Sequence, residues 1–182
     1  MSKLYIGIDP GKNGGIVAKI DGQIVESIVM PTKAKFYLTG EINEIFTNLI
    51  ETFSEDGDVL VCFEDIHSMH RNGASANFGM GFASGYLEGL CTGMGLPFVK
   101  VQPKKWQEYC WQGIQPIKIN TGEKTAKGNI KYKIDTKGTS LVAVQRLYPT
   151  ADLTGRGRDR ATKPHDGVVD GLLICHYAEN NL

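Results

Sequence analysis

The stretch KLYIGIDPGKNGGIVAKIDGQIVESIVM, residues 3–30, decides the start of the fold. It contains three short apolar runs, each with the length of a β-strand. The runs cover residues 3–9, 14–20 and 23–30. Asp21 and Gly22 lie between the last two runs, and an Asp-Gly pair in that position is a strong hairpin signal. We therefore predict an antiparallel meander of three strands that ends at Pro31.

Beyond this meander the sequence alternates between helical and strand patterns. Residues 39–53 place their apolar side chains on one face at helical spacing. Residues 58–63 are apolar on both faces, which is typical of a central strand parallel to the first one. Further segments are a fifth strand at 97–101 and helices at 74–94, from 102, at 139–148 and at 165–178. The sequence thus predicts an α/β fold with a five-stranded mixed sheet, in which strands 1–3 are antiparallel and strands 4 and 5 run parallel to strand 1, flanked by helices.

The helix predicted at 74–94 carries a glycine at every fourth position. These glycines are Gly81, Gly85, Gly89 and Gly93. Each costs about 1 kcal/mol relative to alanine in a helix interior. We expect close packing of this stripe to offset the cost, against the sheet or a second helix, in the same chain or in a partner copy.

Length and charge favour one domain that spans residues 1–182. The chain has 20 basic and 20 acidic side chains, so its net charge excludes no class of partner. The charges are unevenly distributed, however. Residues 100–137 carry 9 Lys/Arg against 3 Asp/Glu, whereas residues 1–99 carry 6 against 12. One segment of the chain is therefore strongly basic.

The cysteine pattern indicates a reducing compartment. None of the cysteines forms a CxxC pair, so we expect free, mostly buried thiols at Cys62, Cys91, Cys110 and Cys175. The first residues lack the pattern of a secretory signal, and no apolar run approaches the ~20 residues of a membrane-spanning helix. We expect a cytoplasmic protein with no membrane partner.

Four acidic side chains stand where a predicted strand ends or the last helix begins. Asp9 follows the first strand and Glu64 the fourth, and neighbouring parallel strands are ~4.8 Å apart. Asp166 and Asp170 are four residues apart, so they share one face of the last helix. Gathered carboxylates repel one another unless cations neutralise them, and divalent ions held by carboxylates favour phosphoryl chemistry. The hypothesis requires that Asp9 lie within a side chain's reach of Glu64 and Asp170, and that no ammonium group already occupy the cleft.

Each acid also has a structural interpretation. Asp9 could cap the Pro-Gly turn that follows it. Glu64 could be a surface residue at the strand end, with Asp65 as the acid at the rim of the sheet. Asp166 could be a helix N-cap. Asp170 lies in an apolar stretch of helix, where a carboxylate usually has a cation or a polar partner. His165 could be a metal ligand, a general acid or a neighbour of the cap.

The basic part of the chain favours nucleic acid as a partner. Residues 113–138 are polar, rich in lysine and punctuated by glycine, which is typical of a long loop or hairpin insertion. The basic segment interleaves its lysines with Trp106, Tyr109, Trp111 and Tyr132. Lysines neutralise phosphates and aromatic faces stack on unpaired bases, although such lysines could also merely solvate a loop. Further phosphate contacts could come from Arg156, Arg158 and Arg160.

The motif IGIDPG, an apolar strand ending in Glu64, and an acidic pair that opens a last helix reading DGLLI resemble those of the RuvC-type Holliday junction resolvases. These resolvases belong to the ribonuclease H-like superfamily. The likeness runs from Tyr5 to about Tyr177, and the segments VKVQPKKWQ and LVAVQRLYP are similar to those of phage-encoded members. It implies a ribonuclease H-like fold and a homodimeric endonuclease that nicks opposed strands of a four-way DNA junction and leaves 5′-phosphate ends. It also implies two Mg²⁺ ions per site, for which Mn²⁺ would substitute.

The resemblance also implies roles for individual residues. Three family ligands match by position: Asp9, Glu64 and Asp170. The remaining ligand falls on Asp166 if the last two are four residues apart, and on Gly167 if they are three apart; His165 is the other candidate. The family's active-site lysine matches Lys137, with Lys131 and Lys133 as alternatives. The aromatic residue that follows the second acid in the family would fall near His67, Met69 and His70, or further on at Phe78.

Three other functions stay open at the level of sequence. The motif DPGKNGG also resembles the phosphate-binding first hairpin of sugar kinases and actin-like ATPases, but those proteins need a second similar domain and 182 residues leave no room for it. A module of the same fold could bind branched DNA or RNA without cutting it. A nuclease of this fold could act on other branched DNA or on structured RNA.

Overall fold

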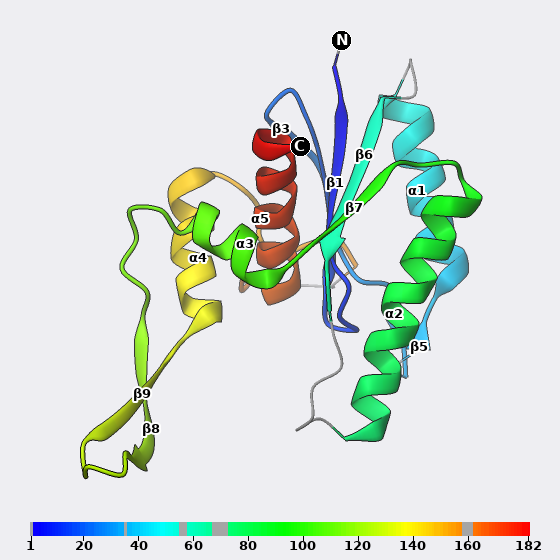
Figure 1. Ribbon diagram of the computed structural model, residues 1–182. Helices are drawn as coiled ribbons and strands as arrows, with labels where there is room; N and C mark the ends of the chain where they lie inside the picture. The colour runs from blue at the N-terminus through cyan, green and yellow to red at the C-terminus, as the bar shows by residue number, and fades with distance from the viewer. Residues whose placement is uncertain (1, 35, 55–57, 67–72, 158–161) are drawn as a thin grey trace.

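The computed structural model describes residues 2–34, 36–54, 58–66, 73–157 and 162–182 (Figure 1). Its centre is a five-stranded sheet in the order β3-β2-β1-β6-β7. β1 (Leu4–Asp9), β2 (Gly15–Ile20) and β3 (Gln23–Val29) form the antiparallel meander. β6 (Val59–Glu64) pairs parallel with β1, and β7 (Phe98–Val101) pairs parallel with β6. The predicted α/β fold class and its mixed strand directions are confirmed.

The turn between β2 and β3 has the geometry that its Asp-Gly sequence predicts. Both Asp21 (φ 48°) and Gly22 (φ 78°) adopt positive φ, as the two central residues of a type I′ hairpin must. A second, very short hairpin follows Pro31 and was not predicted. It consists of β4 (Thr32–Lys33) and β5 (Phe36–Tyr37), which are too short to show an alternating pattern in sequence.

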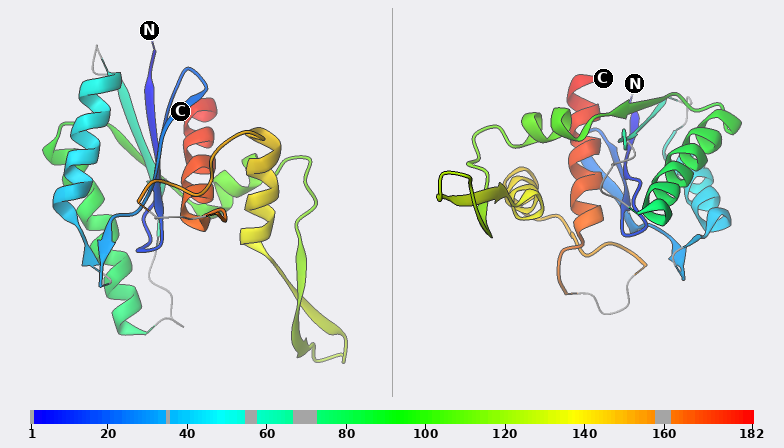
Figure 2. Two further views of the ribbon diagram at one scale, coloured as in Figure 1. Left: turned by 180° about the vertical axis from the view of Figure 1, so that it is seen from behind. Right: turned by 60° about the horizontal axis from the view of Figure 1, so that its bottom comes forward.

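Helices cover both faces of the sheet (Figure 2). On one face lie α1 (Thr39–Phe53) and α2 (Ala74–Gly93), whose buried side chains join those of β1 and β6 in one apolar core. On the other face α5 (Asp166–Asn181) crosses β1 and β2, with α3 (Pro103–Cys110) and α4 (Thr136–Leu147) packed beside it in a second core. The sheet is therefore buried on both faces, which explains why its central strands read as continuous apolar runs.

Glycines let the backbone of α5 come into direct contact with the backbone of β1 and of the start of β2. A Cβ built on Gly7 of β1 would come within 2.4 Å of the Gly171 carbonyl oxygen, and one built on Gly167 would lie 2.2 Å from the Gly14 carbonyl carbon. No side chain fits at either contact. This close approach fixes the start of α5 beside the end of β1.

The glycine stripe of α2 does not behave as expected within the chain. Gly81, Gly85, Gly89 and Gly93 are exposed, and a Cβ added to any of them would meet no described atom within 4 Å. Packing against the sheet is therefore wrong as an explanation, because Ala83, Leu87 and Cys91 supply the buried side of this helix.

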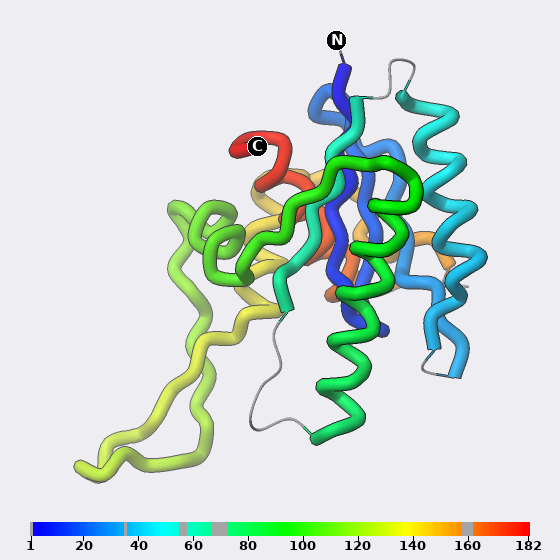
Figure 3. The backbone as a smooth tube through the Cα atoms, turned by 45° about the vertical axis from the view of Figure 1, so that its right-hand side comes forward, coloured from blue at the N-terminus to red at the C-terminus, as the bar shows by residue number. Residues whose placement is uncertain are grey.

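Between α3 and α4 the chain forms a hairpin that projects from the body of the fold (Figure 3). Its strands are β8 (Lys118–Lys124) and β9 (Ile130–Ile134). α4 begins three residues before the predicted start because Asp135 caps it, accepting a hydrogen bond from the Gly138 amide over 3.1 Å.

All four cysteines are free and buried, as predicted. Among the described helices, none is both long and apolar enough to cross a lipid bilayer.

Candidate active site

Strand pairing brings two of the predicted acids together. Ile8 of β1 pairs with Phe63 of β6, so the next residues, Asp9 and Glu64, leave the same edge of the sheet on adjacent parallel strands. Both side chains are partly buried. Asp9 Oδ1 accepts a hydrogen bond from the Gly11 amide over 3.0 Å, so the predicted capping of the turn is real and coexists with a place in the site.

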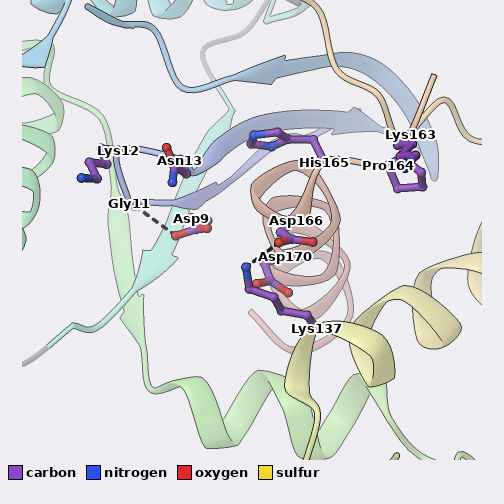
Figure 4. Close-up of a pocket in the computed structure, with 10 residues that line it drawn as sticks. All are labelled: Asp9, Gly11, Lys12, Asn13, Lys137, Lys163, Pro164, His165, Asp166 and Asp170. Atoms are coloured by element: carbon purple, nitrogen blue, oxygen red, sulfur yellow. Dashed lines mark hydrogen bonds and ion pairs between the residues drawn. The ribbon is translucent and has the colours of Figure 1, made fainter. Parts of the chain in front are cut away.

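The first turns of α5 add the other two acids. Asp166 is the first residue of the helix and is exposed, whereas Asp170 lies one turn later and is partly buried. Asp9, Asp166 and Asp170 line one cleft of about 570 Å³, whereas Glu64 is not among its lining residues (Figure 4). The cleft is lined by Asp9, Gly11, Lys12, Asn13, Lys137, Lys163, Pro164, His165, Asp166 and Asp170.

Burial raises the pKa values of all three inner acids, and the charge of Asp9 adds to the rise at the other two. Burial, followed by the charge of Asp9, raises the pKa of Glu64 to about 7 and that of Asp170 to about 7. Burial also raises the pKa of Asp9. Glu64 adds a further upward contribution to the pKa of Asp170. These three carboxyl groups thus form a cluster whose full ionisation is disfavoured unless a cation is present.

Polar partners hold two of the inner acids in place. Trp106 Nε1 donates a hydrogen bond to Glu64 Oε1 over 3.1 Å, and this contact opposes the rise in the pKa of Glu64. A hydrogen bond from Ser140 of α4 likewise opposes the rise in the pKa of Asp170. Each acid is therefore oriented by a side chain from the same face of the sheet as α5.

An ammonium group does reach the cleft, but it pairs with the outermost acid. Lys137 Nζ lies 2.5 Å from Asp166 Oδ2, and the two side chains are 69% and 55% exposed. The pair raises the pKa of Lys137. Lys137 also lowers the pKa of Asp9, yet that pKa remains above its usual value because burial outweighs the lysine. The requirement that no ammonium group occupy the cleft is thus not met at its outer edge, where Lys137 pairs with Asp166.

The structure decides several alternatives that the sequence left open. Asp166 is not the N-cap of α5, because His165 occupies that position and Asp166 is the first helical residue. Gly167 cannot be a ligand position, because its Cα faces the Gly14 backbone at contact distance. Asp65 lies 3.8 Å from Lys100 Nζ at its closest oxygen, whereas Glu64 is the acid coupled to Asp9 and Asp170.

The structure separates the lysines that line the cleft from those that lie on the hairpin. Of the lysines proposed for the site, Lys137 lines the cleft, whereas Lys131 lies on the hairpin and pairs with Glu123 over 2.9 Å. Lys12 and Lys163 also line the cleft, although neither was predicted as a site residue.

Some predicted nucleic-acid contacts are not available. Trp106 is 1% exposed, so its predicted stacking on a base is wrong. Its spacing of four from the buried Cys110 on one helix face was the signal that it belongs to the core. Arg156 pairs with Glu26 over 2.7 Å and does not line the cleft. His67, Met69, His70, Arg158 and Arg160 lie outside the described residues.

The donor set fits divalent cations in chemistry. Carboxylate oxygens are the ligands that Mg²⁺ and Mn²⁺ prefer, and three of the acids here carry raised pKa values that a cation would relieve. Among the described residues, however, no three His, Cys, Asp or Glu side chains are already arranged to hold an ion. The carboxylates would therefore have to turn toward a bound ion.

Comparisons with known proteins support the fold. No family model matches the sequence, and no curated protein sequence matches it. The structure of Thermus thermophilus RuvC in complex with a Holliday junction substrate is similar over 98% of this chain and 96% of that chain, with a TM-score of 0.56 and 16% identity. A second Thermus thermophilus RuvC structure covers 97% and 96%, with a TM-score of 0.49 and 16% identity. The first of these two structures shows that the fold of RuvC is present over nearly the whole chain, as the resemblance predicted.

Proposed function

We propose that this chain is a divalent-metal-dependent endonuclease that resolves four-way DNA junctions. The observation that carries the proposal is the cluster of Asp9, Glu64 and Asp170, three partly buried acids whose pKa values are raised, mainly by burial, at the sheet end of a RuvC-like fold. Phosphodiester hydrolysis by paired metal ions needs such a cluster.

The acids and the lysines of the site have different roles in this proposal. Asp9, Glu64 and Asp170 would hold two Mg²⁺ ions, with Asp166 as the outer ligand. Bound Mg²⁺ would supply a nucleophile from water and stabilise charge on the phosphate. Lys137 now pairs with Asp166; with the ions bound it would turn its ammonium toward the phosphate and stabilise the charge that develops during cleavage. Lys12 and Lys163 attract the substrate backbone to the same cleft.

Assembly and location complete the proposal. The chain acts as a single domain, residues 1–182, that carries the β8–β9 hairpin as an insertion. It forms a homodimer, so that two clefts reach two opposed strands of the junction. The exposed glycine stripe of α2 supports this, because it leaves room for a second helix to approach closely. We place the protein in the cytoplasm, consistent with its free thiols.

A cleavage assay tests the proposal. A synthetic four-way junction with Mg²⁺ is offered to the native chain and to Asp9→Asn and Asp170→Asn, alongside flaps, forks and RNA–DNA hybrids. We expect paired cuts in the junction, and a loss of at least about a hundredfold in both variants. Asp58→Asn is the control, because Asp58 is an exposed acid just before the opposite end of β6.

Two results would contradict the proposal. Cleavage by Asp9→Asn and Asp170→Asn at the native rate would remove the acids from the chemistry. Tight junction binding without cleavage in Mg²⁺ and Mn²⁺ would instead identify a binding module. Preferential cutting of another branched substrate or of structured RNA would keep the nuclease and replace its substrate.

A further inference from the structure

The β8–β9 hairpin has no buried face. All of β9 and all of β8 except Thr121 are exposed. Its large apolar side chains include Ile130 (50% exposed), Tyr132 (55%) and Ile134 (46%). A two-stranded hairpin is at best marginally stable in water on its own, and a row of exposed apolar residues marks an interaction surface. The hairpin therefore needs a partner to cover it.

The strand register gives the hairpin two unlike faces. Directly opposed residues share a face, so Ile134 lies with Lys118, Tyr132 with Asn120 and Ile130 with Lys124. Because side chains alternate along a strand, Ile130, Tyr132 and Ile134 form one row, which we call the apolar row. Lys131 and Lys133 lie on the opposite face, together with Ile119, which pairs with Lys133 and is 38% exposed.

The charge of the hairpin identifies the class of partner. Between residues 118 and 134 it carries one acid, Glu123, against Lys118, Lys124, Lys127, Lys131 and Lys133. Such an excess of lysine complements a polyanion. A two-stranded ribbon also has the width that the major groove of a DNA duplex accepts. These two properties together favour duplex DNA over a protein surface, which would cover the apolar row but not match the charge.

The root of the hairpin connects it to the cleft. The Asp135 amide donates to the Ile117 carbonyl over 2.8 Å, and the Ile117 amide donates to Thr139 Oγ1 of α4 over 3.0 Å. Lys137 lies between these anchored positions and lines the cleft. Figures 1 and 3 show the hairpin extending past the end of the sheet where β1 and β6 terminate. A duplex held by the hairpin would thus lie next to the acids.

We propose that the β8–β9 hairpin enters the major groove of one duplex arm of the substrate and positions that arm beside the cleft. In this arrangement the apolar row faces the base edges, while the long side chains of Lys131 and Lys133 reach over the groove rim to the phosphates. The opposite orientation would leave the apolar row in water. The inference rests on the proposed function for the identity of the substrate, but the binding of a duplex by the hairpin does not depend on cleavage.

Binding measurements test the lysine face. Fluorescence anisotropy at several salt concentrations, in Ca²⁺ or EDTA, would compare the native chain with Lys133→Gln on a four-way junction and on a plain duplex arm. We expect Lys133→Gln to reduce the slope of log affinity against log salt by about 1. Lys3→Gln is the matched control, because Lys3 packs over Tyr5 at the opposite end of β1. An unchanged slope for Lys133→Gln would overturn the phosphate contact.

The apolar row needs a separate variant and a readout of its own. Tyr132→Ser with Ile134→Ser is expected to weaken junction binding about tenfold without changing the salt slope, because an apolar contact releases no counterions. Cleavage by this variant should fall at low DNA concentration and recover at saturation. Sedimentation of the same variant reports self-association, and loss of the dimer with unchanged DNA affinity would overturn the proposal in favour of a protein interface.

The two proposals fail in different ways. If the native chain cuts junctions and the hairpin variants bind and cut like it, the hairpin inference is wrong and the nuclease stands. If the chain cuts nothing but the hairpin variants still lose duplex affinity, the hairpin inference stands and the nuclease is wrong.

Discussion

The buried indole of Trp106 donates a hydrogen bond from Nε1 to Oε1 of Glu64 over 3.1 Å. Trp106 belongs to α3, which packs beside α5 on one face of the sheet, and its side chain reaches Glu64 at the end of β6. The contact fixes the orientation of a carboxylate that its own strand leaves free to rotate. A side chain that orients a metal-binding carboxylate commonly affects metal affinity as much as activity.

Trp106→Phe is therefore expected to raise the Mg²⁺ concentration needed for half-maximal cleavage by about tenfold or more, because Glu64 loses its donor. Titration of the cleavage rate with Mg²⁺ measures this. The control is Trp111→Phe, because the buried Nε1 of Trp111 has no acceptor among the described residues. If both variants lose the same thermal stability and neither shifts the Mg²⁺ response, Trp106 only fills the core.

The raised pKa of Asp170 predicts how stability depends on pH without metal. Its folded-state pKa of about 7 lies above the ordinary value of 3.8, so between these pH values the folded state binds more protons than the unfolded state. Stability is therefore expected to fall as the pH rises from about 4 to about 7 in EDTA, and to level off above that range. Glu64 adds to the same trend.

Asp170→Asn should remove part of this dependence. At pH 8 in EDTA we expect this variant to melt roughly 3 °C or more above the native chain, while the difference shrinks at pH 4. Addition of Mg²⁺ should stabilise the native chain more than the variant. A variant that melts below the native chain at pH 8 would show that the carboxylate is not under repulsion.

The ion pair between Lys137 and Asp166 predicts a graded loss of activity at the outer ligand. Because Asp166 is exposed and paired, Asp166→Asn should reduce cleavage less than Asp170→Asn does. Lys137→Gln should reduce the turnover rate by about a hundredfold if its ammonium stabilises the phosphate. An exposed pair contributes only about 0–1 kcal/mol to stability, so thermal melting of Lys137→Gln should hardly change. Equal losses from Asp166→Asn and Asp170→Asn would contradict the grading.

The contact between Gly167 and Gly14 predicts a strict requirement for glycine. Gly167→Ala would place a Cβ 2.2 Å from the Gly14 backbone, so α5 must move and carry Asp166 and Asp170 with it. We expect a loss of about 1–3 kcal/mol in the free energy of unfolding, measured with urea, and a loss of cleavage. Gly40→Ala on α1 is the control, because a Cβ there meets no described atom within 4 Å and should not destabilise.

The exposed stripe of α2 predicts the dimer interface. Gly85→Leu meets no described atom within the chain, so it should leave the folded monomer intact and block the close approach of a second helix. Sedimentation is expected to show a monomer, with unchanged circular dichroism and no paired cutting. Gly40→Leu serves as a control outside α2. A Gly85→Leu protein that remains dimeric would place the interface elsewhere.

The sequence by itself determined the order and type of the main elements, because their signals are local. The Asp21-Gly22 turn, the apolar runs of β1 and β6 and the helical spacing of α1 each depend on a few neighbouring residues. It also predicted Asp9, Glu64 and Asp170 as candidate site residues, since an acid that follows a buried strand or interrupts an apolar helix stands out against its neighbours, and the structure shows raised pKa values for all three.

Only the tertiary structure decided which long-range partners these residues have. It showed the hydrogen bond from Trp106 to Glu64, the ion pair of Lys137 with Asp166 and the backbone contact of Gly167 with Gly14. It also showed that no described residue packs on the glycine stripe of α2. The physical reason is that such contacts depend on how helices pack across a sheet, which is set by the summed packing of many side chains rather than by any pattern along the chain. The spacing of residues along the chain therefore predicts the candidate site side chains, whereas tertiary packing determines their orientation.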